Sequence, residues 1–511
     1  MKLIQMVLPL GLIITIGLSA CSKPADPSTS AYWIELLANK KQRPEALKQL
    51  GQLGDKTALP AVVTWFEKKG PWQAEAAYAI GQLGDETQIP IILAEIDYTL
   101  GTGTDSKTKS LNRVNINIAK ALAMLKGEAS VDPLVRLTDM PDPATRVEAI
   151  NALGKIRNSK ATGCLVEIAD TESQPFIRKV AIVALGEIRD PKAVPVLIKS
   201  LFQELPGTSF YYEARFALLQ IGAPSVPDLL NTFKRKIRDV ENIRLLVGSP
   251  IAEGAIEGKT GFVLGALRAK SAEAPMVHAL NTLYKKYQNE APVFASIPGA
   301  ISELAYSLGQ LGNTKASSSL IKLAKESNQS LRIAAIEALV AIGDKSQSGS
   351  LTTLAGTGNY QSRKPIVEAL ALLGTNQQKN SLEKMELDSP ESTKQWKSLL
   401  STLSPAMDLP NVCKQETTCW ENKLEDTNSW VRRRAAHELG WMNSRKSVQA
   451  LLKAAEDQQQ SVRMAALASI DRVGGAPAAE LQEILDRWSK KIEYRNSNQE
   501  LKRLLARLRS N

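Results

Sequence analysis

Histidine is nearly absent from this sequence, which has only His278 and His437 among 511 residues. Triads of Ser, His and Asp and di-iron centres both depend on well-placed imidazoles, and a di-iron centre needs several of them. Carboxylate pairs remain open as an alternative, because 53 acidic residues offer many of them and none is distinguished by its spacing. The sequence therefore predicts no metal, no cofactor and no catalytic residue.

Long apolar runs are missing except at the start of the chain. Residues 1–21 read MKLIQMVLPLGLIITIGLSAC, with one lysine followed by an apolar stretch from Leu3 to Gly17. That stretch is too short, and too interrupted by Gly and Pro, for a stable membrane span. We therefore expect residues 1–20 to be an export signal that the mature protein lacks.

The end of this segment, Leu18-Ser19-Ala20-Cys21, resembles the lipobox of bacterial lipoproteins. The resemblance implies cleavage before Cys21, a diacylglycerol on its sulfur and an acyl chain on its amine, which together make a stable membrane anchor. Residues 21–31 are rich in Pro and Ser and are expected to form a flexible tether. Ser22 is similar to the residue that directs such proteins to the outer membrane, facing the periplasm; a host with one membrane would place the chain on the cell surface. The alternative is an ordinary export signal with a chance cysteine.

Cysteine is also scarce, with four residues in all. No second pair accompanies Cys413 and Cys419, so a zinc site is not expected. Export permits disulfides, and these two residues lie in a stretch, residues 405–421, that interrupts the pattern of the chain. The sequence predicts a local disulfide between Cys413 and Cys419.

The formal net charge is +11, and the segment from Asp486 to Asn511 alone holds eight basic and three acidic residues. Such an excess can indicate nucleic acid or anionic lipid as a partner. An exported protein meets little nucleic acid, so none is predicted as a partner. The basic C-terminal helix is expected to be mainly a solvated face.

A twelve-residue phrase recurs along the rest of the chain. The clear copies are AEAAYAIGQLGD at 74–85, VEAINALGKIRN at 147–158, KVAIVALGEIRD at 179–190 and SELAYSLGQLGN at 302–313, and weaker copies end near 344, 374, 444 and 475. A period of about 30 residues is typical of a stacked repeat array. The sequence therefore predicts an all-α superhelix and a binding function.

One unit, residues 55–85, shows the expected anatomy. Residues 55–60 start a first helix with turn and cap residues, its apolar stripe lies at 61–66, and residues 69–71 end it. A second helix runs from about Trp72 to Leu83. The small residues of the second helix, Ala76 and Ala77 among them, are expected to lie against neighbouring helices, where the backbones approach closely. Gly84 is expected to end the helix in the left-handed conformation.

No unit can bury its apolar faces alone, so about 12–13 helix pairs are expected to stack, some of them degenerate. The interruptions of the period divide the chain into 32–233, N-terminal repeats; 234–300, an inserted or degenerate region; 301–404, central repeats; 405–421, the disulfide loop; and 422–511, C-terminal repeats ending in the basic helix.

These units resemble HEAT-like repeats of the short type first associated with phycobilin lyases. The resemblance rests on the Ala-Ala-x-Ala-Leu-Gly run, the closing Gly-Asp, and an arginine at the start of the second helix: Arg146, Arg178, Arg332, Arg363, Arg432 and Arg463. The arginines could form an anion-binding ladder, but repetition at one register favours hydrogen bonds to a neighbouring turn, for example near Asp142. Some metal-dependent hydroxylases have similar repeats, yet their histidines are missing here.

Second helices usually line the concave side of such a solenoid. Positions spaced i, i+3 and i+7 on that side are candidates for contact with a partner: Glu75, Tyr78, Gln82, Glu303, Tyr306, Gln310, Arg434, His437 and Trp441. The alternative for the tyrosines is packing against adjacent repeats.

The segment 420–441 holds three of the eight tryptophans and the run Arg432 to Arg434. One interpretation is a recognition patch, and the other is a degenerate repeat that uses bulky residues to fill space. The sequence as a whole favours a membrane-anchored envelope lipoprotein, a non-enzymatic scaffold that binds an envelope protein as a monomer or within a hetero-complex. The alternative is an envelope enzyme, or an accessory subunit of one, that acts on cell wall or exported protein.

Overall fold

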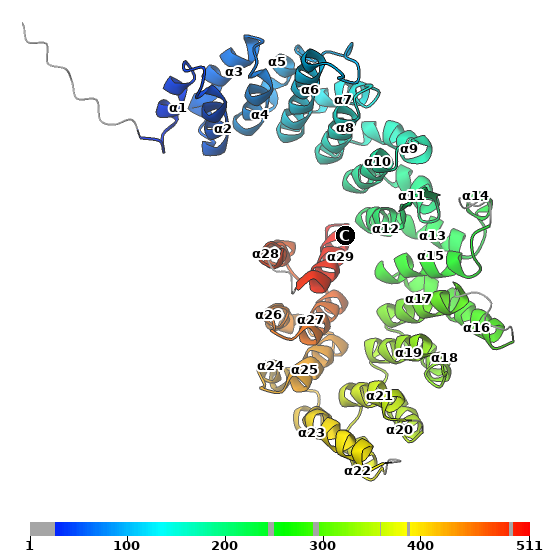
Figure 1. Ribbon diagram of the computed structural model, residues 1–511. Helices are drawn as coiled ribbons and strands as arrows, with labels where there is room; N and C mark the ends of the chain where they lie inside the picture. The colour runs from blue at the N-terminus through cyan, green and yellow to red at the C-terminus, as the bar shows by residue number, and fades with distance from the viewer. Residues whose placement is uncertain are drawn as a thin grey trace, which may run out of the picture. The chain divides into compact units, whose positions relative to one another are not determined.

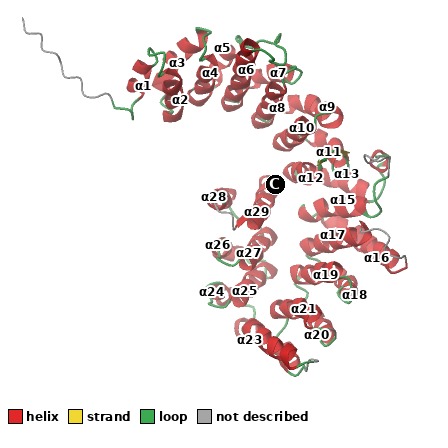
Figure 2. Ribbon diagram, viewed as in Figure 1, coloured by secondary structure: helices red, strands yellow, loops and turns green. Residues whose placement is uncertain are grey.

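The chain is a stack of antiparallel helix pairs in a computed structural model that describes residues 26–243, 250–289, 296–357, 359–385, 389–489 and 494–510 (Figures 1 and 2). It divides into two compact units, Met1–Glu148 (unit 1) and Ala149–Asn511 (unit 2). The predicted signal, and Cys21 with it, fall outside the described residues. Within those residues, no helix is long and apolar enough to cross a membrane.

The first eight helices are α1 Ser30–Leu36, α2 Arg43–Leu53, α3 Leu59–Glu67, α4 Gln73–Leu83, α5 Ile89–Leu93, α6 Ser106–Leu125, α7 Val131–Leu137 and α8 Pro143–Ile156, the last of which spans the boundary between the units. Unit 2 continues with α9 Thr162–Thr171, α10 Pro175–Ile188, α11 Val194–Ser200, α12 Tyr211–Ile221, α13 Val226–Phe233, α14 Arg238–Glu241, α15 Ala255–Ala266, α16 Glu273–Asn289, α17 Ser296–Leu311, α18 Ser317–Leu323 and α19 Gln329–Ile342. Its remaining helices are α20 Ser348–Ala355, α21 Tyr360–Leu373, α22 Asn376–Glu383, α23 Pro390–Cys413, α24 Thr417–Lys423, α25 Ser429–Trp441, α26 Val448–Ala454, α27 Gln460–Val473, α28 Ala478–Trp488 and α29 Arg495–Ser510.

Most of these helices pack in consecutive pairs: α1/α2, α3/α4 and α5/α6 in unit 1, and α9/α10, α11/α12, α13/α15 and α16/α17 through α28/α29 in unit 2. The predicted all-α repeat architecture is confirmed. The region 234–300, predicted to be inserted or degenerate, contributes the repeat helices α15 and α16. The interruption near 206–212 is a small antiparallel hairpin of β1 Glu204–Leu205 and β2 Thr208–Ser209, which pairs Glu204 with Ser209.

Short 3-10 turns lead into most first helices. A turn commonly begins at the Asp or Asn that ends the repeated phrase: Asp85 accepts a hydrogen bond from the Thr87 N–H at 3.1 Å, and Asp190 accepts one from Lys192 N–H at 3.0 Å. This is the usual side-chain cap of an exposed helix start. The turns are η1 Lys56–Ala58, η2 Glu86–Gln88, η3 Glu128–Ser130, η4 Ser159–Ala161, η5 Pro191–Ala193, η6 Ala223–Ser225, η7 Lys270–Ala272, η8 Thr314–Ala316, η9 Lys345–Gln347 and η10 Arg445–Ser447.

The Ala-Leu-Gly run sets the distance between successive second helices. A Cβ added to Gly186 of α10 would lie 2.7 Å from the Cα of Ala217 on α12, and one added to Gly81 of α4 would lie 2.6 Å from the Cα of Ala121 on α6. Real Cβ atoms do not approach so closely, so these positions require glycine opposite a small residue. The expected close approach of backbones at the small residues is confirmed.

The expectation for Gly84 is wrong in one respect. Gly84 ends α4, but its φ of −86° is not left-handed. Glycine is instead needed here because a Cβ at this position would lie 2.9 Å from the Ile80 carbonyl oxygen. In other repeats the left-handed position is held by Lys126, Arg157 or Arg189, so glycine is not obligatory there.

The repeated arginines tie each second helix to the end of the first helix before it. Arg146 Nε donates to the Thr138 carbonyl at 2.8 Å, and Arg432 donates to the Asp426 carbonyl at 2.8 Å. Arg178 and Arg332 make the corresponding contacts to Asp170 and Glu326. Carbonyls at a helix end lack intrahelical partners, and these guanidinium groups supply the missing donors. The interpretation as hydrogen bonds to a neighbouring turn is confirmed.

The segment 405–421 is not a loop. Helix α23 continues through Pro405 and Pro410 to Cys413, and α24 begins at Thr417. A proline inside a helix leaves the carbonyl four residues earlier without its donor. The donor that replaces Pro410 comes from another repeat and forms part of the site described below.

Candidate functional site: the inner faces of the two units

The candidate row of unit 1 lies on α4 and is open at its centre. Tyr78 is 40% exposed, one of few large hydrophobic side chains that stand so far out among the described residues. Glu75 forms an ion pair with Arg113 of α6, and Gln82 covers Gly51 of α2. The two polar side chains therefore brace α4 against its neighbours, and the tyrosine ring between them faces solvent.

Lysines flank this ring at equivalent positions of the neighbouring repeats. The motif LGQLGD at 50–55 aligns with IGQLGD at 80–85, which makes Lys48 the counterpart of Tyr78. The same alignment of the α6 sequence places Lys120 there. Lys48 is exposed and Lys120 is half-buried, so an accessible aromatic ring lies between two cationic side chains.

The corresponding row of unit 2, on α17, is covered by the chain itself. Tyr306 stacks on Phe262 of α15 with ring centres 5.5 Å apart, and Gln310 Nε2 donates to the Tyr306 hydroxyl at 3.2 Å. Burial raises the pKa of Tyr306 to about 12. Burial also raises the pKa of Glu303, an effect that the nearby Lys259 opposes.

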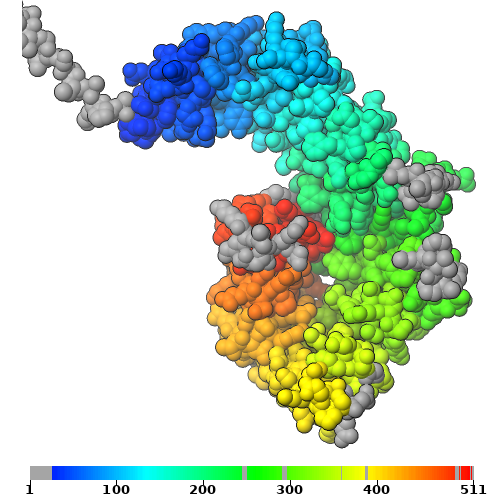
Figure 3. All heavy atoms as spheres, in the orientation of Figure 1, coloured from blue at the N-terminus to red at the C-terminus, as the bar shows by residue number. Residues whose placement is uncertain are grey.

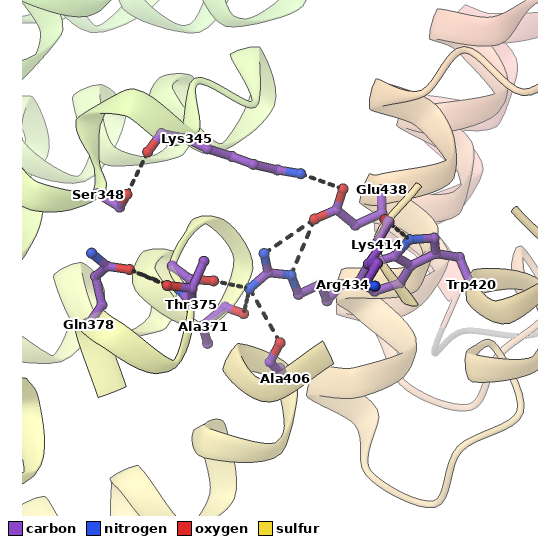
Figure 4. Close-up of polar contacts among 11 residues, drawn as sticks. Lys345, Ser348, Ala371, Thr375, Gln378, Ala406, Lys414, Trp420, Arg434 and Glu438 are labelled. Atoms are coloured by element: carbon purple, nitrogen blue, oxygen red, sulfur yellow. Dashed lines mark hydrogen bonds and ion pairs between the residues drawn. The ribbon is translucent and has the colours of Figure 1, made fainter. Parts of the chain in front are cut away.

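Arg434 on α25 is fully buried and joins three helix pairs (Figure 4). One of its terminal nitrogens, Nη1, donates to Ala371 O at 3.0 Å and Gly374 O at 2.6 Å, at the end of α21, and to Ala406 O of α23 at 3.3 Å. The last carbonyl is the one that Pro410 leaves without a donor. Arg434 therefore repairs the interrupted helix and fixes α25 against α21 and α23.

Glu438 balances the buried charge of Arg434. Its carboxylate lies 3.2 Å from the Arg434 guanidinium and 2.7 Å from Lys345 Nζ, which comes from the turn after α19. Burial lowers the pKa of Arg434, and Glu438 opposes that change. The three side chains form a network that spans residues 345 to 438 (Figure 4).

His437 and Trp441 of α25 lie toward the end of α19, which belongs to the earlier repeats of unit 2. Their rings stack at 5.3 Å, and the indole covers the last turn of α19, where a Cβ on Gly343 would meet Trp441 Nε1 at 2.5 Å. Burial lowers the pKa of His437 to about 3, with smaller contributions from three arginines, Arg433 first. The imidazole is therefore neutral at physiological pH.

These contacts belong to a larger interface within unit 2, here named the seam: the contact of α25, α27 and α29 with α12, α15, α17, α19 and α21. Arg268 Nε lies 2.7 Å from Asp471 Oδ2, and Arg472 donates to the Ala341 carbonyl. In Figure 3 the C-terminal helices of unit 2 lie against its green segment, and only a narrow opening is visible between them. The inner face of this unit is thus largely occupied by its own C-terminal repeats.

The structure thus separates the predicted contact residues. Glu75, Tyr78 and Gln82 lie on an open face. The candidates on α17 and α25 instead contact other parts of the chain: Glu303, Tyr306, Gln310, Arg434, His437 and Trp441. Sequence reasoning missed their partners across the seam, such as Arg268 and Asp471, because no periodicity links positions 203 residues apart. The available signal was that Arg, His and Trp stand in one repeat at the positions that Glu, Tyr and Gln hold in the other two candidate rows.

Cys413 and Cys419 are joined by a disulfide in the structure, with their Cα atoms 5.3 Å apart. Trp420 is buried, and its indole N–H donates to the Lys414 carbonyl at 3.0 Å, which closes the turn between α23 and α24. Trp420 and Arg434, two members of the proposed recognition patch, are thus interior residues. Within the described part of the chain, no group of three or more His, Cys, Asp or Glu side chains could hold a metal ion.

Comparison with known proteins agrees with this architecture. Residues 136–206, 300–371 and 420–494 match a family model of HEAT repeats. These three segments are thus similar to HEAT repeats, and the chain is an α-helical solenoid, an architecture typical of protein-binding scaffolds. No curated protein sequence matches the chain.

Several solved structures resemble the fold. An importin beta crystallised in an ammonium sulfate condition is 13% identical over 93% of this chain and 66% of its own, with a TM-score of 0.46. The CpcE and CpcF complex of phycocyanin lyase from Nostoc sp. PCC7120 is 16% identical over 62% of this chain and 94% of its own, with a TM-score of 0.21. Human deoxyhypusine hydroxylase in complex with glycerol is 18% identical over 57% and 98%, with a TM-score of 0.23. At these values the likeness says nothing of function.

Proposed function

We propose that the chain is a membrane-anchored envelope lipoprotein that binds an envelope protein through the inner face of unit 1. The observation that carries this proposal is the exposed ring of Tyr78, held on a preformed helix face between Lys48 and Lys120. Tyrosine combines a large apolar surface with a hydroxyl and is frequent at the energetic centres of interfaces. Binding a partner costs the scaffold little conformational entropy, because α4 is already fixed by its neighbours.

The state of Glu75 supports a docking role for this face. One carboxylate oxygen pairs with Arg113, whereas the other, Oε2, is buried and has no hydrogen-bond partner within the chain. A buried carboxylate oxygen is normally satisfied. A donor on a segment lying along the row would reach this oxygen next to Tyr78 by shifting the side chains that cover it.

The test is photo-crosslinking in cells from a photoreactive amino acid placed at position 78, with position 64 as the matched control. Thr64 is exposed on α3, the first helix of the same pair. We expect one dominant protein adduct from position 78 and none from position 64. Equal patterns at both positions, or no adduct from position 78 in a folded and exported protein, would reject the inner face of unit 1 as the binding surface.

The membrane anchor is a separate part of the proposal and rests on the lipobox-like segment that ends at Cys21. Its test is metabolic labelling with a palmitate analogue followed by fractionation of the envelope. We expect label on the wild-type chain and on Cys164→Ser, and none on Cys21→Ser, which should also leave the outer-membrane fraction. Label retained by Cys21→Ser would overturn the anchor.

A further inference from the structure

The seam of unit 2 has a different chemistry from the contacts between repeats. Repeats meet through fully buried leucines and alanines, such as Leu185 and Ala217, whereas the seam collects charged groups. In particular, three consecutive second helices place arginines in it: Arg434 of α25, described above, and also Arg433 of α25, Arg472 of α27 and Arg503 of α29.

Arg503 pairs with Glu500 of its own helix at 3.0 Å, and the group that it meets across the seam is aromatic. Its guanidinium lies 5.2 Å from the ring centre of Phe262, which in turn stacks on Tyr306. Arg215 of α12 lies 4.6 Å from the same ring. Guanidinium groups are attracted to the faces of aromatic rings and stack on them, so α15 and α17 present a surface suited to a planar cation.

The acceptor of Arg472 is a helix end. Its guanidinium donates to the Ala341 carbonyl in the last turn of α19, and a Cβ on Gly312, just after α17, would lie 3.0 Å from it. The last carbonyls of a helix lack intrahelical donors and carry partial negative charge. Arg472 therefore occupies a cation site between the ends of two adjacent repeats.

Arg433 is influenced by the charge of two carboxylates across the seam, and its buried Nε has no hydrogen-bond partner. Glu337 of α19 and Glu368 of α21 both interact electrostatically with it, and burial raises the pKa of both carboxyl groups. Burial also lowers the pKa of Arg433 itself. Removing charges from water opposes part of their mutual attraction, so the seam gains less from closing than an apolar contact would. Interfaces between domains that move apart are likewise more polar than permanent ones.

We propose that the inner face formed by Phe262, Tyr306, Glu337, Ala341 and Glu368, here named the acceptor face, is a binding surface for an arginine-bearing polypeptide, and that α25, α27 and α29 occupy it as an internal ligand. A partner that presents several arginines displaces these helices and opens the seam, which also breaks the bonds of Arg434 to the end of α21 and of Glu438 to Lys345. This surface is distinct from the Tyr78 row of unit 1, so the proposal does not depend on the function proposed above.

Lysine would satisfy this surface less well than arginine. The aromatic pair and the carbonyl and carboxylate groups favour a planar ion with several donors, whereas an ammonium group is a compact, strongly hydrated charge. The chain as a whole has a net charge of +11. The positive net charge of the chain therefore repels any polycation. Binding of an arginine peptide would for that reason indicate a local site.

The experiment titrates the full mature chain with a nonapeptide of arginine and with one of lysine, by calorimetry at fixed salt. The seam variant carries Arg433→Gln, Arg472→Gln and Arg503→Gln. The matched control carries Lys446→Gln, Lys453→Gln and Arg487→Gln, which remove the same charge from exposed residues. If the internal ligand leaves the seam open in about 10% of the molecules, the apparent affinity for an added peptide is about tenfold lower than that of the open form.

We expect the seam variant to bind the arginine peptide about tenfold more tightly than the control does, with no such gain for the lysine peptide. Adding Glu337→Gln and Glu368→Gln to the seam variant should remove the gain. Equal affinity of the seam variant and the control, or equal gains for the two peptides, would overturn the proposal.

A second measurement follows the opening of the seam in a chain whose seam residues are unchanged. Spin labels at the exposed positions 315 and 446 lie on opposite sides of the seam, in η8 and η10. We expect the arginine peptide to lengthen the distance between the labels and the lysine peptide to leave it unchanged. An unchanged distance at a saturating concentration of the arginine peptide would contradict displacement, even if the seam variant failed to fold.

Discussion

The guanidinium of Arg434 donates to the carbonyl of Ala406, 3.3 Å away, in a helix that Pro410 would otherwise leave one hydrogen bond short. The same nitrogen serves the two carbonyls at the end of α21, and Glu438 balances its charge. A side chain at the register expected for partner contact thus holds together three successive repeats. Its removal should affect stability before it affects recognition.

Replacing Arg434 with methionine should destabilise α21 to α25 by about 3–5 kcal/mol, because Glu438 and three carbonyls would lose a buried donor. Native-state hydrogen exchange of the amides in these helices measures the local free energy of opening. Arg445, exposed in η10, gives the control, and Arg445→Ala should change the value by less than about 0.5 kcal/mol. Similar effects of the two substitutions would show that the buried network contributes little.

Helices α10 and α12 approach so closely at Gly186 that there is no room for a Cβ atom. We expect Gly186→Ala to lower stability by about 1–3 kcal/mol, the usual cost of overpacking. Gly163 of α9 is a matched control, since an added Cβ there meets nothing within 4 Å. Gly163→Ala should instead stabilise the chain by up to about 1 kcal/mol through helix propensity. Thermal denaturation of both variants tests the opposite signs.

His437 should make unit 2 sensitive to acid. Its pKa is about 3 in the folded chain, against about 6.5 when unfolded. Its contribution to stability is therefore complete above pH 6.5 and is lost as the pH falls from 6.5 towards 3. Arg433, Arg434 and Arg472 face it and stay charged throughout this range.

The comparison of wild type with His437→Gln isolates this effect, because Glu337, Glu368 and Glu500, whose pKa values are raised by burial, titrate in both proteins. Between pH 7.5 and 4.5 we expect the stability of the variant relative to the wild type to rise by about 2–3 kcal/mol, measured as denaturation midpoints in urea. A constant difference between the two proteins across this pH range would show that His437 is protonated without opening the seam.

Loss of the disulfide should loosen the junction of α23 and α24. In the chain-entropy model a loop of this length is worth about 2–3 kcal/mol, so Cys413→Ser with Cys419→Ser should lower the denaturation midpoint by that equivalent. Reductant should have the same effect on the wild type and none on the double variant. The Cys164→Ser variant should behave as the wild type; sensitivity of the double variant to reductant would point to a different linkage.

The parts of the fold that repeat were predictable from the sequence, because local rules determine them. The Gly-Asp ending of the phrase corresponds to a helix end followed by a capped turn at Asp85, and the arginine at its start, as in Arg146, bonds the preceding helix end. Each contact lies within one unit or between adjacent units. A period in the sequence therefore carries the information.

The seam was not predictable, because it depends on curvature summed over many repeats. Small rotations between units decide whether Arg268 meets Asp471 or solvent, and no local pattern records them. The prediction of a loop at 405–421 was wrong for a related reason. Pro410 usually indicates a helix end, and the residue that compensates for it, Arg434, follows 24 positions later in another repeat.

The contact of Arg268 with Asp471 also changes how the two halves of the chain should fold. Unit 1 is an open stack whose contacts are local, so an end repeat can fray and re-form without disturbing the others. In unit 2 the last repeats are held on a second side by residues about 200 positions earlier. Because that loop must close before the seam forms, unit 2 is expected to fold more slowly and to lose its repeats together, as a single cooperative block.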